Sequence, residues 1–338
     1  PCNNATNAAT IATCVASMPG GVDPNGVIGS GNIQPNAQIP ATFGGNPTLG
    51  EETSDSYTFG IVLEPRFIPG LTITADYFNI NIDDSIQTFG GGLNNTLDLC
   101  FNQVQDITAP ICAPFAGGTA RSPGGAITTA FNPLVIQDNI ANQEVSGIDL
   151  EFNYSTTIPF SLLTDSGEQD FNISFLGTWT EKANFTPVQG FPTVNECSGR
   201  FGTTCSAGAV FGEPVPEYKW TSRATFVDGP MTTSLRWRHL SSVTDDNAGT
   251  DFSQFNGVEE LNSYDLLDIT FSFEVNENLT VAFGVDNVFD TLPQTPTFDA
   301  NGIVNSVNNG TLLGDNQEQA NTYPATYNPF GRQFFVSG

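Results

Sequence analysis

Basic residues are scarce in this sequence, and their scarcity excludes one class of partner. Only nine of the 338 residues are Lys or Arg, against 36 Asp and Glu, so the formal net charge is −27. A chain of this sign repels the phosphate backbone of DNA and RNA, which excludes nucleic acid as a partner. Histidine is scarcer still. His239 stands alone and the sequence has no Cys-x-x-Cys pair, so zinc is not predicted.

Long hydrophobic runs are also missing. No apolar stretch approaches the roughly 20 residues that a membrane-spanning helix needs. The chain starts at Pro1, with neither a signal peptide nor an initiator methionine, so we interpret it as a processed chain or as part of a longer one. Its hydrophobic content is nevertheless 38%, with 27 Phe, which is enough apolar material for a large folded body.

What the sequence does contain is a series of short segments in which apolar and polar residues alternate. Alternation with a period of two is typical of strands that have one apolar and one polar face. Nine segments are predicted to be strands: 53–67, 71–83, 142–158, 171–184, 217–228, 231–243, 263–275, 279–290 and 328–338. An antiparallel sheet of this kind is either a soluble sandwich or a membrane barrel.

The connections between these segments alternate between short and long. The short ones contain turn residues, such as Pro69-Gly70 and Asp228-Gly229-Pro230. The long ones, rich in Asn, Gly, Pro and Thr, are 1–52, 84–141, 187–216, 244–262 and 291–327. Outer-membrane barrels have tight turns at the periplasmic rim and long loops outside, so this pattern favours a barrel. No low-complexity linker divides the chain, and one domain is predicted over 1–338.

The apolar faces of the segments predict which side chains contact lipid. Several apolar stripes carry an aromatic residue near one end, as in interfacial aromatic girdles. The side chains expected to face lipid include Trp220, Phe226, Leu235, Phe271, Phe273, Val281 and Phe283. The opposite faces are polar, as the wall of a water-filled or plugged lumen would be.

Five segments together resemble the C-terminal barrel of TonB-dependent outer-membrane receptors. They are residues 45–60 (GNPTLGEETSDSYTFG), 69–84 (PGLTITADYFNINIDD), 146–151 (SGIDLE), 284–290 (GVDNVFD) and 327–335 (YNPFGRQFF). Each motif is short, but their order and spacing extend over nearly the whole chain. The resemblance implies an all-β fold, an antiparallel transmembrane barrel of about 22 strands that surrounds a plug. The nine segments then correspond to the last nine strands, and residues 1–52 to an outer loop.

The chain departs from the family pattern in two respects. It lacks the plug and the segment that contacts TonB, and it stops at Val336-Ser337-Gly338, a few residues before the expected terminal aromatic. Nine strands leave two open edges, which lipid cannot satisfy. We therefore expect the rest of the receptor, with its plug domain, to exist as another chain or as sequence outside this one.

The resemblance implies a function as well as a fold. It implies an outer-membrane receptor, not an enzyme. Such a receptor takes up a siderophore, cobalamin, haem or oligosaccharide, and the TonB energy-coupling complex drives the uptake. Its partners would be outer-membrane lipid, the plug, TonB and the ligand, with the long loops extracellular and no cofactor. The acidic composition argues against polyanionic ligands. The alternatives are a structural or adhesive surface protein that binds partners through its loops, and a secreted polysaccharide-acting enzyme, for which no catalytic grouping is found.

Four of the nine basic residues are expected to form one cluster on the lumenal face. If the 218–239 hairpin pairs symmetrically about Asp228 and Met231, Arg223 lies opposite Arg236. The cluster comprises Lys219, Arg223, Arg236 and Arg238. Like charges in such a position need compensation, from plug carboxylates, from Asp and Glu of neighbouring strands or from an anionic ligand. Pairing with the plug or the wall is favoured, because enclosed charges are usually paired.

The six cysteines form three close pairs, each within one long connection. Local disulfides in an oxidising compartment are the simplest interpretation: Cys2–Cys14, Cys100–Cys112 and Cys197–Cys205.

Two further features of the long connections are candidate sites. Asp245, Asp246 and Asp251 offer oxygen ligands suited to calcium, but they lack the spacing of an EF-hand, which favours a solvated acidic loop. Eight phenylalanines either line a ligand vestibule or pack the loops together: Phe101, Phe115, Phe131, Phe191, Phe201, Phe211, Phe252 and Phe255. His239 falls on the apolar stripe near its outer end, where we expect an interfacial role.

Overall fold

In a computed structural model, the protein divides into two compact units. The structure describes residues 1–34, 39–191, 194–202, 205, 213–246, 260–293, 323 and 325–338. The first unit, here called the helical unit, consists of Pro1–Ser54, Ile82–Gln143 and Phe185–Val194. The second, here called the sheet unit, consists of Asp55–Asn81, Glu144–Asn184 and Asn195–Gly338.

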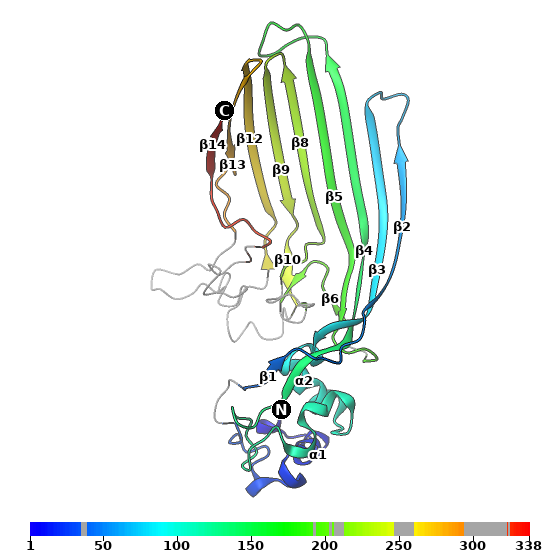
Figure 1. Ribbon diagram of the computed structural model, residues 1–338, viewed down its shortest axis with the longest axis vertical. Coiled ribbons are helices and arrows are strands. Elements are labelled where there is room, and N and C mark those ends of the chain that lie inside the picture. The colour runs from blue at the N-terminus through cyan, green and yellow to red at the C-terminus, as the bar shows by residue number, and fades with distance from the viewer. Residues whose placement is uncertain are drawn as a thin grey trace. The chain divides into compact units, whose positions relative to one another are not determined.

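Nine principal strands form one sheet, as the sequence predicts. Their order is β14-β13-β12-β9-β8-β5-β4-β3-β2, so that every strand pairs with its neighbours among these nine along the chain (Figure 1). The bounds are β2 Thr53–Leu63, β3 Leu71–Thr88, β4 Leu134–Ile158, β5 Gln169–Thr186, β8 Tyr218–Asp228, β9 Met231–Leu240, β12 Tyr264–Asn276, β13 Leu279–Asp286 and β14 Gln333–Ser337. The strands paired in sequence from β5 to β14 are antiparallel.

Some strand bounds differ from the prediction. β3 continues to Thr88 and β4 begins at Leu134, so both extend into the predicted long connection 84–141. β14 begins only at Gln333, because the preceding run contains Pro329 and Gly331, which interrupt a strand. The described residues also form five short strands: β1 Thr42–Gly44, β6 Asn195–Glu196, β7 Arg200–Phe201, β10 Val243–Asp245 and β11 Glu260–Leu261.

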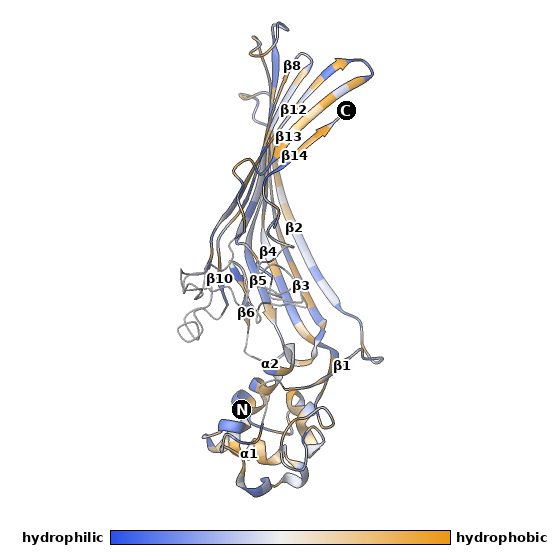
Figure 2. Ribbon diagram, turned by 90° about the vertical axis from the view of Figure 1, so that its left-hand side faces the viewer, coloured by the Kyte–Doolittle hydropathy of each residue, from blue (hydrophilic) through white to orange (hydrophobic). Residues whose placement is uncertain are grey.

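The two faces of the sheet differ in polarity. Aromatic side chains meet across strands on one face: Phe271 stacks on Phe283 with ring centroids 5.4 Å apart, and Trp220 meets Trp237 edge-on at 4.9 Å. Figure 2 shows hydrophobic bands alternating with hydrophilic ones along β12 and β13. Phe283 is 52% exposed, as expected of an apolar face that none of the described residues covers.

The short connections of the sheet unit lie together at one end of the strands (Figure 1). The carboxylate of Asp228, the last residue of β8, holds the 159–168 connection at this end of the strands. It accepts hydrogen bonds from the backbone amides of Leu162, Leu163 and Thr164 and from the hydroxyls of Thr164 and Ser166. Asp228 is therefore buried although it sits beside a turn.

The helical unit is built from segments that the sequence suggests are loops without regular structure. That expectation is wrong for a large part of them. The helices are η1 Cys2–Asn4, α1 Ala8–Ala16, η2 Pro19–Gly21, η3 Pro24–Gly26, η4 Phe89–Gly91, α2 Leu93–Asp98, η5 Leu99–Val104 and η6 Pro110–Gly118. Asn7 caps α1, since its side chain accepts from the amides of Ala9 and Thr10. None of the described helices is long and apolar enough to cross a membrane.

Two disulfides and a buried arginine sit in the core of the helical unit. Cys2–Cys14 and Cys100–Cys112 are both formed, as predicted. Arg121, only 4% exposed, donates to Ser17 Oγ (3.0 Å) and to Gly125 O (2.9 Å). Its guanidinium also lies 5.6 Å from the centre of the Phe101 ring. Burial lowers the pKa of Arg121 to about 10.

Candidate functional site

The basic cluster lies on the polar face of the sheet, on the adjacent strands β8 and β9. Because side chains alternate between faces, residues of one parity on β5, β8, β9 and β12 share this face. The observed register pairs Asp228 with Met231 and Arg223 with Arg236, as the symmetric hairpin predicts. The same register places Thr221 opposite Arg238. We call Lys219, Arg223, Arg236 and Arg238 the basic ladder.

A single carboxylate on the next strand neutralises part of the ladder. Arg236 Nε lies 2.7 Å from Asp268 Oδ2, and Arg238 Nη2 lies 3.0 Å from the same oxygen. Asp268 is buried, with its side chain 4% exposed, and Asp268 Oδ1 accepts from the Asn287 amide at 2.8 Å. Asp286 on β13 is a weaker partner, 3.6 Å from Arg236 Nη2. Of the compensations considered for the ladder, the described residues provide pairing within the wall.

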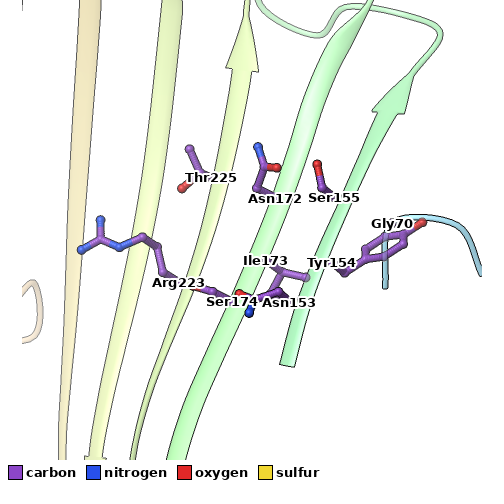
Figure 3. Close-up of a pocket in the computed structure, with 9 residues that line it drawn as sticks. All are labelled: Gly70, Asn153, Tyr154, Ser155, Asn172, Ile173, Ser174, Arg223 and Thr225. Atoms are coloured by element: carbon purple, nitrogen blue, oxygen red, sulfur yellow. The ribbon is translucent and has the colours of Figure 1, made fainter. Parts of the chain in front are cut away.

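The other two members of the ladder are exposed and have different surroundings. Arg223 donates to Ser234 Oγ at 2.9 Å. Figure 3 shows its side chain extending away from Ser155 and Asn172. Within the described residues neither Arg223 nor Lys219 makes an ion pair. The ladder therefore retains two cations that carboxylates of the described wall leave unpaired.

Three cavities open along the ladder. Around Arg223 lie one of about 150 Å³, which also contacts Gly70, and one of about 260 Å³, which reaches Asp268 and Asp286 (Figure 3 shows the first). The largest, about 310 Å³, is lined by both Lys219 and Arg238. We call it the Lys219 pocket. The ladder thus passes from a polar region near the short turns to a larger pocket near the long connections.

The predicted phenylalanine vestibule is not assembled by the described residues. Phe101 and Phe115 are fully buried and pack against each other at 5.3 Å in the core of the helical unit. Phe201 is buried in a second core of the sheet unit, against Tyr323. These three pack loops together, which is the second of the two interpretations. Of the rest, Phe131 is exposed and Phe191 half-buried, while Phe211, Phe252 and Phe255 lie outside the described residues.

The acidic candidate for calcium is only partly described. Asp245 ends β10, and Asp246 follows it and accepts a hydrogen bond from the Cys205 amide at 3.1 Å. Asp251 lies outside the described residues. Across the part of the chain that the structure describes, no group of three His, Cys, Asp or Glu is placed to hold a metal. The third predicted disulfide, Cys197–Cys205, is formed nearby.

Sequence reasoning missed a polar group on the apolar face. Asp265, at the start of β12, accepts from Trp237 Nε1 at 2.7 Å and lies 2.8 Å from His239 Nδ1. The His239 ring stacks between Tyr218 and Trp220, with centroid distances of 5.6 and 5.2 Å. His239 is therefore held by aromatic rings and a carboxylate. Asp265 and Phe271 are separated by an even number of residues on one strand, so their side chains share a face. The place of Asp265 on the apolar face could therefore have been predicted.

Most of the chain matches a known protein family. Residues 16–288 match the family described as TonB dependent receptor-like, beta-barrel. A mutant of the ferric enterobactin receptor PfeA from Pseudomonas aeruginosa is similar to the chain, with 17% identity, a TM-score of 0.47, and coverage of 87% of this chain and 32% of that one. The ferric yersiniabactin uptake receptor FyuA from Yersinia pestis is similar at 12% identity and a TM-score of 0.40, covering 84% and 29%. No curated protein matches. The chain thus spans about a third of the solved receptors.

Proposed function

Because the chain belongs to the TonB-dependent receptor β-barrel family, we propose that it forms part of the wall of an outer-membrane receptor that imports a scarce nutrient. The observation that carries this proposal is the nine-stranded sheet with one lipid-compatible face and one charged face. A siderophore, cobalamin, haem or oligosaccharide is the class of cargo, and the long connections face the exterior. TonB supplies the driving force, and the remaining wall and the plug complete the receptor.

The end of the ladder near the short turns, formed by Arg223 and Arg236, has a role in this scheme. Arg223 is exposed on the polar face without an ion pair among the described residues, and Arg236, directly opposite it, shares Asp268 with Arg238. A carboxylate of a plug placed against this face would complete the charge pairing. Arg223 and Arg236 are thus proposed contacts of the plug, whereas capture of the nutrient depends on the outer connections.

Growth and uptake test the main proposal in the bacterium that carries the complete receptor gene. Deletion of the receptor and deletion of TonB should abolish uptake of the same nutrient from a panel of ferric siderophores, cobalamin, haem and oligosaccharides. The complete receptor should also require detergent for purification. Uptake that persists in both deletion strains, or a receptor that is soluble without detergent, would contradict the proposal and favour a surface adhesin.

The plug contact needs a separate measurement in the complete receptor. Arg236→Ala should raise passive entry of nitrocefin, followed by its hydrolysis in the periplasm, and leave nutrient binding at the cell surface unchanged. Arg332→Ala is the matched control, since Arg332 is an exposed arginine outside the ladder. If Arg236→Ala instead weakens nutrient binding and leaves nitrocefin entry unchanged, the ladder contacts the ligand and not the plug.

A further inference from the structure

The Lys219 pocket interrupts the polar face with apolar side chains. Two cross-strand rows meet there. The first runs Leu176, Thr221, Arg238 and Leu266, and the second runs Thr178, Lys219, Leu240 and Tyr264. In the first row Arg238 lies opposite Leu266, and in the second row Lys219 lies opposite Leu240. The next row toward the short turns, Ser174, Arg223, Arg236 and Asp268, contains no apolar side chain.

The apolar side chains of the pocket are partly available to a ligand. Leu176 is 58% exposed although it lies on the polar face, which is costly for a wall that only meets water. Leu266 and Tyr264 are buried and form a floor, and the Tyr264 hydroxyl is already engaged with Asn328 O at 3.0 Å. An exposed leucine beside a lysine and above a buried aromatic floor is suited to the apolar part of a small molecule.

The two cations of the pocket are paired unequally by the described wall. Asp268 draws Arg238 toward the neighbouring row, through Nη2, and the buried Arg238 Nε has no hydrogen-bond partner among the described residues. Lys219 is exposed and makes no ion pair within the same residues. Lys219 therefore has no ion-pair partner in the described wall, and Arg238 shares Asp268 with Arg236. The carboxylates of Asp149 and Glu213 lie at the border of the pocket, where they accept hydrogen bonds from Thr178 and Thr326.

We propose that the Lys219 pocket binds an organic anion with an apolar body, in which a carboxylate or a group of like charge meets Lys219 and Arg238 and the apolar part lies on Leu176. This inference rests on the proposed function, because it assigns a chemical class to one group of the imported nutrient. A lysine ammonium provides three donors for such an anion, and the pocket's hydroxyl at Thr221 adds a polar contact. Its volume of about 310 Å³ admits a group of the size of a single substituted ring.

Binding of benzoate to the complete receptor in nanodiscs tests this inference without knowledge of the nutrient. Benzamide has the same ring and no charge, and inorganic phosphate has the charge and no ring. We expect saturation-transfer NMR to detect benzoate in the pocket, with benzamide and phosphate each at least about tenfold weaker. Equal binding of benzamide, or displacement of benzoate by equimolar phosphate, would overturn the proposed class.

Variants locate the binding site. Lys219→Gln should weaken benzoate binding about tenfold, and Lys219→Arg should retain it, since a cation persists at the position. Arg223→Gln, in the next row of the same face, is the matched control and should leave benzoate binding unchanged. Unchanged binding to Lys219→Gln, with the heat-modifiable folded band intact on a gel, refutes the assignment.

The failure of this inference and of the proposed function can be told apart. TonB-dependent uptake that proceeds normally in the Lys219→Gln strain, with benzoate binding also unchanged, rejects the pocket and keeps the transport function. Benzoate binding that depends on Lys219 in a receptor whose deletion affects no uptake keeps the pocket and rejects the transport function.

Discussion

Arg236 and Asp268 face each other across β9 and β12, with Arg236 Nε 2.7 Å from Asp268 Oδ2. The same carboxylate oxygen lies 3.0 Å from Arg238, so one buried acid serves two arginines that stand two residues apart on one strand. Since Arg223 lies directly opposite Arg236, this acid offsets a repulsion that the hairpin alone leaves in place. The stability of the hairpin on the polar face thus depends on the strand that follows it.

Removal of the shared carboxylate should destabilise the barrel. Asp268→Asn leaves two arginines with an uncharged partner beside Arg223, and we expect a loss of about 1–3 kcal/mol in the free energy of unfolding from lipid vesicles in urea. Asp286→Asn is the matched control. Its carboxylate is 39% exposed and 3.6 Å from Arg236, so the loss should stay below about 1 kcal/mol. Equal losses for the two variants would contradict a special role of Asp268.

The hydrogen bonds to Asp228 should protect the backbone amides of the 159–168 connection from exchange with solvent. Asp228→Ala removes the acceptor of five hydrogen bonds, so the amides of Leu162, Leu163 and Thr164 should exchange with solvent on the order of tenfold faster. Asp165→Ala, an exposed acid in the same connection, should leave the exchange unchanged. Hydrogen–deuterium exchange with mass spectrometry measures both, and protection that persists in Asp228→Ala would show that the connection is held by other contacts.

Trypsin provides a single-site test of the disulfides in the helical unit. Arg121 is the only Lys or Arg in Pro1–Ser54, Ile82–Gln143 and Phe185–Val194, and it is buried. Replacement of Cys100 and Cys112 by serine should reduce the stability of the unit by about 2–3 kcal/mol and allow cleavage after Arg121. The new terminus at Ser122 is identified by mass spectrometry.

The third disulfide serves as the control for this test. Cys197 and Cys205 both belong to the sheet unit, so their replacement by serine should leave the Arg121–Ser122 bond resistant to trypsin. Cleavage at that bond in the native, oxidised protein would mean that the helical unit opens in spite of its disulfides.

Adjacent residues on β12 test the assignment of the two faces. Phe271→Arg places a charge on the face where Phe271 stacks on Phe283, and near the bilayer midplane it should cost about 2–4 kcal/mol of unfolding free energy. Thr270→Arg places the same charge on the polar face, beside the cavity that Asp268 and Asp286 line, and should be nearly neutral. Reversed costs, measured by urea unfolding from vesicles, would mean that the faces are inverted.

Tyr327 and Tyr264 form a matched pair for the cost of a buried hydroxyl. The rings meet edge-on at 5.4 Å, but only Tyr264 donates a hydrogen bond, to Asn328 O, and the buried Tyr327 hydroxyl has no partner among the described residues. Tyr264→Phe should lower the unfolding free energy by about 1 kcal/mol, whereas Tyr327→Phe should preserve or raise it.

The same tyrosine predicts a loss of stability in alkali. Burial raises the pKa of the Tyr327 phenol above its ordinary range. Above roughly pH 10 the unfolded chain loses this proton while the folded chain keeps it, so the folded state binds more protons and its stability falls as the pH rises. In Tyr327→Phe this part of the alkaline decline should vanish from thermal unfolding curves. An identical decline in both proteins would rule out Tyr327 as its source.

The sequence sufficed for local pairing but not for pairing across long connections. The opposition of Arg223 and Arg236 was predictable because a short turn at Asp228 sets the register of its own hairpin. The partnership of Arg236 with Asp268 was not, because β9 and β12 are joined by more than 20 residues, so no turn relates their registers. The rows of the Lys219 pocket were missed for the same reason, since Leu266 and Tyr264 belong to β12.

The helical unit escaped prediction for a different reason. α1 is only nine residues long, and its stability depends on a disulfide and on packing, not on a clear apolar stripe. The Asn7 cap was a readable local signal. Phe101 and Phe115 resembled vestibule residues because both fall in the long connection predicted over 84–141. In the structure they are enclosed by segments distant along the chain, among them Met18 and Ile33.

The hydrogen bonds of Asp228 form only when β8 pairs in its native register. Its hydrogen bonds join β8 to the connection between β4 and β5, and β5 lies between β4 and β8 in the sheet. A slip of β8 by two residues would keep every side chain on its own face, so the alternation of apolar and polar residues does not forbid it. The slip would, however, move Asp228 by roughly 7 Å and leave all five donors without their acceptor. A barrel that closed in the wrong register would thus be marked at its rim by a loosened 159–168 connection.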